Sequence, residues 1–222
     1  MFKGFQREVA RLLLHHLGIY GFVLSGGLAL SEHELTNRPT EDIDLFTSLF
    51  DNSQFEQAIN EALAALKQAG YQATLSRKAD TFARIEVFQG SETLSVDLGY
   101  DYREYDAVTL DIGPVLDKRD AILNKVSALY ARMLPRDFID VYNSIQSGTM
   151  TKAEILKLSK ERDEGFVLEY FADALRRAQA FSFVDFSEYD ISREVYGAIK
   201  TALLSWAEEI ETGQDTNNEK GV

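Results

Sequence analysis

Two carboxylates, Asp42 and Asp44, lie two residues apart in a stretch that predicts a β-strand. Side chains alternate between the two faces of a strand, so these carboxylates point the same way and could share a divalent cation. Gly26 and Gly27, the second of them fifteen residues before Asp42, stand at the start of a predicted helix. A backbone turn that can approach phosphates, followed by a metal-binding acidic pair, suits chemistry on a nucleoside triphosphate.

Both features also have purely structural explanations. The glycine pair could be a turn between a strand and a helix, and the acidic pair could be a solvated strand end. Phosphatases of the haloacid-dehalogenase type also carry Asp-x-Asp, but Gly-Thr follows their second Asp, whereas Leu45 and Phe46 follow here. An EF-hand loop is excluded because the required Gly and the terminal Glu are missing.

A third carboxylate, Asp97, lies in the sequence Leu94-Ser95-Val96-Asp97-Leu98. Alternation along this predicted strand puts the three apolar side chains on one face and Asp97 on the other. If this strand neighbours the one that carries the acidic pair, three carboxylates converge, as two-metal phosphoryl and nucleotidyl transfer requires. The alternative is a solvent-facing residue on a half-exposed strand.

The pattern of apolar residues predicts the elements that must position these groups. Capping boxes begin two of the helices, at Ser53 with Glu56 and at Thr151 with Glu154. An aromatic but aperiodic segment, 181–190, is expected to be a packed loop. The expected strands are 20–24, 43–46, 71–75, 81–88 and 93–98, and the expected helices are 2–17, 26–35, 55–69, 117–132, 135–146, 151–161, 165–180 and 192–211.

The composition is that of a folded enzyme. Of the 222 residues, 45% are hydrophobic, which is enough for a substantial core. The absence of cysteine excludes disulfides, thiolate zinc sites and cysteine nucleophiles. No apolar run approaches the roughly 20 residues that cross a bilayer, and the first residues do not begin a secretory signal, so we expect a cytoplasmic protein.

The net charge of −13 argues against a broad nucleic-acid-binding surface, because phosphate contacts need clustered Lys and Arg. Positive charge is nevertheless concentrated in residues 117–136. Lys118, Lys125 and Arg132 follow one another at intervals of seven and share one face of a predicted helix. This face is either a solvated helix surface or a basic wall for a triphosphate or the end of an RNA.

Four short motifs follow one another in the sequence: Gly26-Gly27-Leu28-Ala29-Leu30, Arg38-Pro39-Thr40-Glu41-Asp42-Ile43-Asp44-Leu45, Lys125-Val126-Ser127-Ala128-Leu129-Tyr130-Ala131-Arg132 and Arg136-Asp137-Phe138-Ile139-Asp140-Val141-Tyr142. In this order they resemble the motifs of AbiEii-type nucleotidyltransferases. This family belongs to the polymerase-beta-like superfamily and includes toxins of type IV abortive-infection systems and the related MenT toxins. The motifs extend from Ser25 to Tyr142, somewhat more than half of the chain.

The resemblance implies a role for each matching position. Gly26-Gly27 would let backbone N–H groups approach the triphosphate, and Ser25 would offer a hydroxyl to a phosphate oxygen. Asp42 and Asp44 would hold Mg²⁺ or Mn²⁺. The superfamily has a third metal-binding carboxylate. Asp97 is the candidate for that position, but it lies outside the four motifs, so it matches less securely than Asp42 and Asp44 match the first two.

In the later motifs, the resemblance implies that Lys125 neutralises charge on the triphosphate and that Asp140 acts near the nucleotide or orients Lys125. These two residues are fifteen apart on successive predicted helices and meet only if the helices pack antiparallel. Arg132 is a candidate nucleotide-binding residue, and Arg38 a candidate phosphate or structural partner. Thr40 matches a hydroxyl residue that is phosphorylated in some MenT-like toxins, so it is a candidate regulatory phosphosite; alternatively, its hydroxyl stabilises the local turn.

The implied function is Mg²⁺- or Mn²⁺-dependent transfer of NMP from an NTP by a toxin of a type IV toxin–antitoxin or abortive-infection system. As in MenT-like members, the acceptor would be a tRNA 3′ end, and its modification would block translation. A cognate antitoxin is the implied protein partner, and we expect a monomer. Two alternatives remain: a nucleotidyltransferase that modifies a small molecule or a protein side chain, and a non-catalytic binding module on the same fold.

The resemblance also implies an α+β fold, with a nucleotidyltransferase-like mixed sheet and flanking helices followed by a C-terminal helical bundle. The expected domains are the α/β core at 1–114 and a helical domain at 115–211 that completes the active-site cleft. A disordered tail is expected at 212–222.

Overall fold

The computed structural model describes residues 4–213, and its contacts divide the chain into two units. The first comprises Met1–Glu34 and Thr40–Ala121, and the second comprises Leu35–Pro39 and Ile122–Val222. The expected domain limits at 114/115 and 211/212 stay a prediction. Within the tail expected at 212–222, Thr212 ends the last helix and Gly213 caps it, and 214–222 lie outside the described residues.

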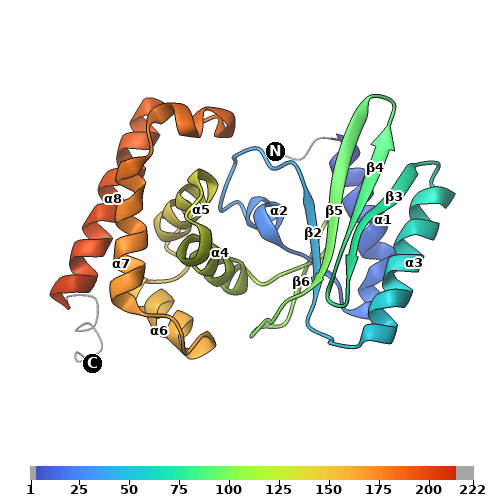
Figure 1. Ribbon diagram of the computed structural model, residues 1–222, viewed down its shortest axis with the longest axis horizontal. Coiled ribbons are helices and arrows are strands. Elements are labelled where there is room, and N and C mark those ends of the chain that lie inside the picture. Colours follow the sequence, from blue (N-terminus) through green and yellow to red (C-terminus); the bar gives the residue numbers. More distant parts are fainter. Residues whose placement is uncertain (1–3, 214–222) are drawn as a thin grey trace. The chain divides into compact units, whose positions relative to one another are not determined.

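The elements of the first unit combine a sheet with three α-helices (Figure 1). They are α1 (Gly4–Leu17), the 3₁₀ helix η1 (Gly18–Tyr20), β1 (Val23–Leu24), α2 (Gly26–Glu32), β2 (Ile43–Thr47), α3 (Asn52–Gln68), β3 (Gln72–Ala79), β4 (Phe82–Gln89), β5 (Glu92–Tyr100), β6 (Val108–Leu110) and β7 (Gly113–Val115). The sheet has seven strands, in the order β3-β4-β5-β2-β1-β7-β6. It is mixed, because β2 pairs in parallel with β5 but antiparallel with β1.

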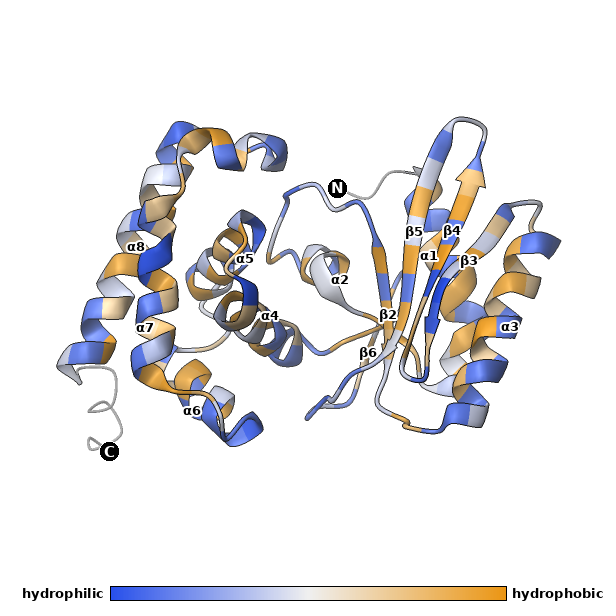
Figure 2. Ribbon diagram, viewed as in Figure 1, coloured by the Kyte–Doolittle hydropathy of each residue, from blue (hydrophilic) through white to orange (hydrophobic). Residues whose placement is uncertain are grey.

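Hydrophobic and hydrophilic residues follow one another along β4 and β5 (Figure 2), and buried residues alternate with more exposed ones along β4. The sheet therefore has an apolar face and a polar one. Ile43, Val96 and Ile85 are opposite one another on adjacent strands, and all three are completely buried. Helices α1 and α3 pack against each other and against strands of the sheet. The polar face carries Asp44 and Asp97.

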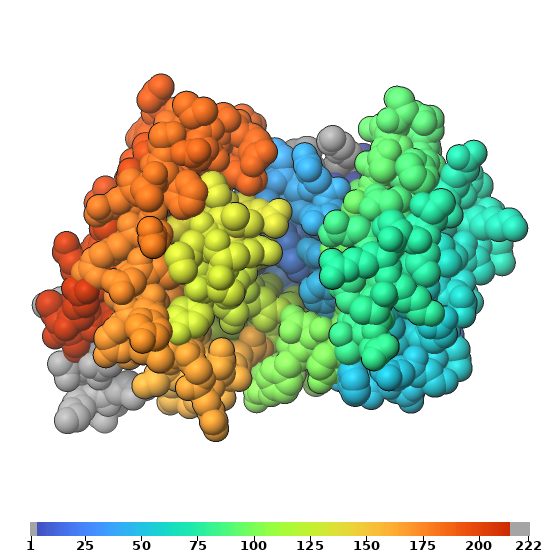
Figure 3. Space-filling view, viewed as in Figure 1, coloured from blue at the N-terminus to red at the C-terminus, as the bar shows by residue number. Residues whose placement is uncertain are grey.

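As far as residue 213, the regular elements of the second unit are all helices, and the short segment Leu35–Pro39 joins them. Its core is aromatic: Trp206 is fully buried, with the Phe171 ring edge-on at 5.2 Å between centroids. The helices of this unit, coloured yellow-green to red, lie beneath a continuous surface of side chains in the space-filling view (Figure 3). They are α4 (Lys118–Arg132, whose first turn belongs to the first unit), α5 (Pro135–Gln146), α6 (Lys152–Arg162), α7 (Leu168–Arg176), η2 (Arg177–Ala180), η3 (Phe183–Tyr189) and α8 (Arg193–Thr212).

The α+β class is confirmed, and most expected elements are present with shifted ends. The expected capping box at residue 53 is wrong: Asp51 accepts the N–H groups of Ser53 and Gln54, so α3 begins three residues earlier than expected. The box of Thr151 with Glu154 is confirmed. The strand expected at 20–24 is reduced to two residues, because Gly21 adopts a left-handed conformation after η1.

Three further differences concern segments without a readable periodicity. Strands β6 and β7 were not predicted, since three residues are too few to show alternation. The edge strand β3 extends to Ala79 through exposed polar residues, which give no apolar pattern. The packed loop expected at 181–190 contains the 3₁₀ helix η3, with Phe186 completely buried.

Within residues 4–213, no helix combines the length and the apolar character that crossing a membrane would need.

Candidate active site

The acidic pair stands at the start of β2. Asp42 directly precedes the strand and Asp44 is its second residue, while the intervening Ile43 and the following Leu45 are completely buried. Both aspartates are partly exposed. Buried Gln6, on α1, donates from Nε2 to the backbone carbonyls of residues 40 and 42 at 3.0 and 3.4 Å. This amide holds the backbone of the acidic pair against the first helix, a function that the sequence did not suggest.

Asp97 joins the pair, because β5 is the parallel neighbour of β2 and Asp97 lies opposite Asp44. One carboxylate oxygen from each of Asp42, Asp44 and Asp97 can be chosen so that all lie within 4.8 Å of one another. Carboxylate oxygens are the ligands that Mg²⁺ and Mn²⁺ prefer. The expected convergence of three carboxylates is therefore found, and the partly exposed oxygens of Asp42 and Asp44 fit a divalent cation.

Arg84 is a member of this site that sequence reasoning missed. It lies on β4 opposite Asp97 and donates from Nε to Oδ1 and from Nη2 to Oδ2, both at 2.6 Å. Its hydrogen bonds to Asp97 are the main cause of a raised pKa of the Arg84 guanidinium. Alternation in β4 was a usable signal that Arg84 faces away from the core, but only the strand pairing reveals its partner.

The glycine turn contacts the acidic pair directly. The N–H of Ser25 donates to the backbone carbonyl of Asp44 at 2.8 Å. Gly26 has a φ of +62°, and a Cβ added there would lie 1.8 Å from Oδ2 of Asp44. Only glycine both adopts this left-handed conformation readily and leaves space for the Asp44 carboxylate. Gly27 is buried, and the hydroxyl of Ser25, a residue only 1% exposed, makes no capping bond with α2.

In the second unit, Lys125 and Arg38 converge on Asp140, which is completely buried. Lys125 Nζ is 3.0 Å from Oδ2 of Asp140. Arg38 donates from Nε to Oδ1 and from Nη2 to Oδ2 of the same carboxylate, each at 2.7 Å. The predicted meeting of Lys125 with Asp140 is therefore found, and Arg38 is in contact with a carboxylate.

Burial alone would raise the pKa of Asp140, but the charge of Lys125 and the hydrogen bond and charge of Arg38 outweigh it, so this pKa lies below its ordinary value. Tyr189, whose ring lies 5.8 Å from the Arg38 guanidinium carbon, has a pKa raised to about 12, first by burial and then by Glu188. The carboxylate of Asp140 thus stays ionised between two cations.

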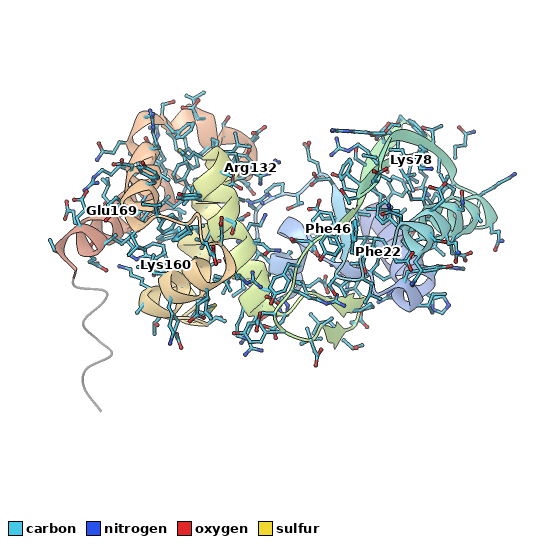
Figure 4. All side chains as sticks on the ribbon, turned by 60° about the horizontal axis from the view of Figure 1, so that its bottom comes forward. Phe22, Phe46, Lys78, Arg132, Lys160 and Glu169 are labelled. Carbon is cyan, nitrogen blue, oxygen red and sulfur yellow. The ribbon has the colours of Figure 1, made fainter. Side chains whose placement is uncertain are left out.

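Arg132, near the end of α4 (Figure 4), pairs with a different carboxylate. Its Nε and Nη2 donate to completely buried Asp137 at 2.9 and 2.8 Å, and Asp137 also accepts the N–H of Leu134. Two of the three cations of the expected basic wall, Lys125 and Arg132, are therefore compensated by carboxylates. A role of Arg132 in nucleotide binding stays a prediction.

Converging carboxylates on a mixed sheet suit an enzyme that acts on a metal-bound nucleotide, and the comparisons with known proteins agree: the protein is a nucleotidyltransferase. Residues 10–212 match the family described as "Nucleotidyl transferase AbiEii toxin, Type IV TA system", and the chain belongs to this family. The resemblance read from the four motifs is thereby confirmed, and the protein is a nucleotidyltransferase toxin of the type IV class.

Two solved structures share the fold. JHP933 from Helicobacter pylori superposes with a TM-score of 0.65 at 17% identity, over 96% of this chain and 93% of that one. A second H. pylori protein, proposed to be a nucleotidyltransferase, gives a TM-score of 0.62 at 16% identity, over 94% of each chain. At such identities the likeness concerns the fold alone. A search of curated proteins finds no match.

Proposed function

We propose that this toxin transfers a nucleoside monophosphate from a nucleoside triphosphate to an acceptor hydroxyl, with Mg²⁺ or Mn²⁺ held by Asp42 and Asp44. The observation that carries this proposal is that Asp42 and Asp44 offer carboxylate oxygens within 4.8 Å of each other beside the glycine turn. A divalent cation bound there would supply charge stabilisation at the transferred phosphate and its leaving group.

The reaction forms one bond and breaks another. The acceptor oxygen attacks the α-phosphorus in line, the hydroxyl proton passes to water, and the bond from the α-phosphorus to the bridging oxygen breaks. Pyrophosphate leaves with the electron pair. In this reaction Ser25 and the backbone of Gly26-Gly27 contact the triphosphate. Lys125 stabilises its negative charge, because an ammonium has three donors and the contact with Asp140 occupies only one.

For the acceptor, we propose a tRNA 3′ end. Nucleotides added there would prevent aminoacylation and so block translation, which accounts for toxicity in the cytoplasm. A cognate antitoxin would counteract the enzyme, and the active species would be a monomer. This proposal is motivated by the toxin family to which the chain belongs. Because Lys125 and Arg132 are paired with carboxylates, a small molecule or a protein side chain is the acceptor to test beside tRNA.

The test is incubation of the purified full chain with each α-labelled triphosphate and Mg²⁺ or Mn²⁺, with total tRNA, total protein or neither added. Label is expected in the tRNA fraction, and removal of the 3′-terminal hydroxyls by periodate should abolish it. Asp42→Asn should give no label. Glu41→Gln is the matched control, since it removes the same charge from an exposed neighbour. Label found only in the protein fraction would show that a protein side chain, and not tRNA, is the acceptor. Equal labelling by Asp42→Asn and by wild type would refute the proposal.

Thr40 is our proposed point of control. It is partly exposed, lies two residues before Asp42, and has its backbone carbonyl held by Gln6. A phosphate on its hydroxyl would add roughly −1.5 to −2 charge next to the acidic pair and so repel the triphosphate. Intact-mass measurement after co-expression with the antitoxin should show one added phosphate. The modified chain should then label no acceptor in the transfer assay. Full inhibition of an unmodified chain would instead mean that the antitoxin acts by binding.

A further inference from the structure

Both carboxylate oxygens of Asp97 are engaged by one guanidinium. Arg84 donates to Oδ1 from Nε and to Oδ2 from Nη2, each at 2.6 Å, and Asp97 is only 7% exposed. A metal ion bound to Asp97 would have to share an oxygen with this guanidinium and would lie against its positive charge. Asp97 therefore differs from a typical metal ligand, because both of its oxygens already accept hydrogen bonds from Arg84.

The ion pair with Asp97 uses only one edge of the Arg84 guanidinium. Its two bonds use Nε and Nη2, so the N–H groups of Nη1 are not part of the pair. The Arg84 side chain is 40% exposed, compared with 10% for that of Asp97. Strand register places Arg84, Asp97 and Asp44 in one row across the polar face of the sheet. A guanidinium that is fixed by Asp97, and has N–H groups outside the pair, thus lies in the same row as Asp44.

We infer that Arg84 contacts a phosphate group of the bound nucleoside triphosphate, and that Asp97 holds Arg84 in place instead of binding the metal. This inference rests on the proposed function and adds a residue to it. A guanidinium is planar and always charged, and it forms parallel hydrogen bonds with phosphate oxygens. Held by Asp97 before the triphosphate arrives, it needs no reorganisation when negative charge develops at the phosphate. Asp97 is then a positioning residue.

Arg77 provides a matched control. It lies on β3 opposite Arg84, so it is on the same face of the sheet, and it is exposed. Its guanidinium carbon is 5.3 Å from the centre of the Phe82 ring. The row runs from Arg77 through Arg84 to Asp97, so Arg77 is one strand farther from the acidic pair. Arg77→Met removes the same charge as Arg84→Met but leaves the pair with Asp97 intact.

The first measurement is Mn²⁺ affinity of the full chain without nucleotide, by titration followed with electron paramagnetic resonance. The double variant Arg84→Met/Asp97→Asn removes one positive and one negative charge, so the net charge at the site is unchanged. Its Mn²⁺ dissociation constant should stay within about threefold of wild type, whereas loss of a true ligand should weaken binding by at least about tenfold. A tenfold loss would overturn the assignment of Asp97.

The second measurement is binding of a non-hydrolysable triphosphate analogue in saturating Mn²⁺. Arg84→Met should weaken it by about tenfold or more, and Arg77→Met should leave it near wild type. Asp97→Asn should cause a similar loss, and the double variant no greater loss than either single one, because the two residues act as a unit. Equal analogue affinity of Arg84→Met and wild type would overturn the inference.

Neither measurement requires turnover. If the wild-type chain labels no acceptor, the proposed transfer function fails, while the two binding measurements still decide the roles of Arg84 and Asp97. Circular dichroism and melting curves of each variant identify any that do not fold. In that case Arg84→Lys, which keeps the charge but loses the planar fork, replaces Arg84→Met and should also bind the analogue more weakly.

Discussion

A Cβ added at Gly26 would lie 1.8 Å from the Oδ2 atom of Asp44. No side chain can be accommodated without moving this carboxylate, and the φ of +62° is in addition unfavourable for alanine. The turn and the acidic pair therefore depend on each other.

Gly26→Ala should accordingly abolish transfer and weaken Mn²⁺ binding. Gly70→Ala is the control: Gly70 has a φ of +87° but nothing within 4 Å of an added Cβ, so it introduces backbone strain without the contact. We expect Gly70→Ala to lose about 1–2 kcal/mol of stability by urea denaturation and Gly26→Ala to lose at least as much, and only Gly26→Ala to lose activity. Normal activity of Gly26→Ala would show that Asp44 can move without consequence.

Asp42→Asn and Asp44→Asn should each reduce transfer by on the order of a hundredfold or more, because each removes a charged ligand of the cation. In the absence of metal, both variants should melt at the same temperature as wild type or higher, since neutralisation reduces repulsion between the carboxylates. Added Mn²⁺ should raise the melting temperature of wild type far more than that of either variant. An equal shift in all three proteins would contradict a metal site here.

Asp140→Ala and Lys125→Met should have unequal effects on stability. Removal of Asp140 leaves Arg38 and Lys125 as buried cations without their shared carboxylate, which should cost roughly 3–5 kcal/mol. Removal of Lys125 leaves Asp140 in its bidentate pair with Arg38 and should cost only about 1–2 kcal/mol. Urea denaturation measures both, and equal losses would argue against the shared network.

Lys125→Ala should slow transfer by orders of magnitude, as expected when a charge that stabilises the transition state is lost. Lys125→Arg should restore little activity, because Arg38 already binds both oxygens of Asp140 and leaves no room there for a second planar fork. Single-turnover rates and triphosphate affinity are the measurements. If both survive in Lys125→Ala, the lysine is structural.

The low pKa of Asp140 has a consequence for acid stability. Its pKa in the folded state lies below the ordinary 3.8, so the carboxylate contributes stability that is fully present above pH 3.8. This contribution is lost as the pH falls through the lower folded pKa. The difference in unfolding free energy between wild type and Asp140→Asn should therefore be constant from pH 7 to pH 5 and shrink only below about pH 4.

The local part of the site could be predicted from the sequence alone. Asp42 and Asp44 are two residues apart at the start of β2, so the approach of their carboxylates follows from local backbone geometry. The same holds for the glycine turn, the long amphipathic helices and the four motifs that identify the family. Such features depend only on residues that are close to one another in the sequence, so they can be predicted from it.

Pairing between distant residues was decided by the tertiary structure. That β5 is the parallel neighbour of β2 brings Asp97 to the acidic pair, and the antiparallel register of β4 with β5 places Arg84 opposite Asp97. Arg38 and Asp140, 102 residues apart, meet because Leu35–Pro39 packs with the second unit although its neighbours in the chain belong to the first. Hydrophobic periodicity specifies which face of a strand or helix is buried. Many strand orders and helix pairings bury the same faces, so periodicity does not select among them. The partner of each buried charge is therefore set only when one tertiary arrangement forms.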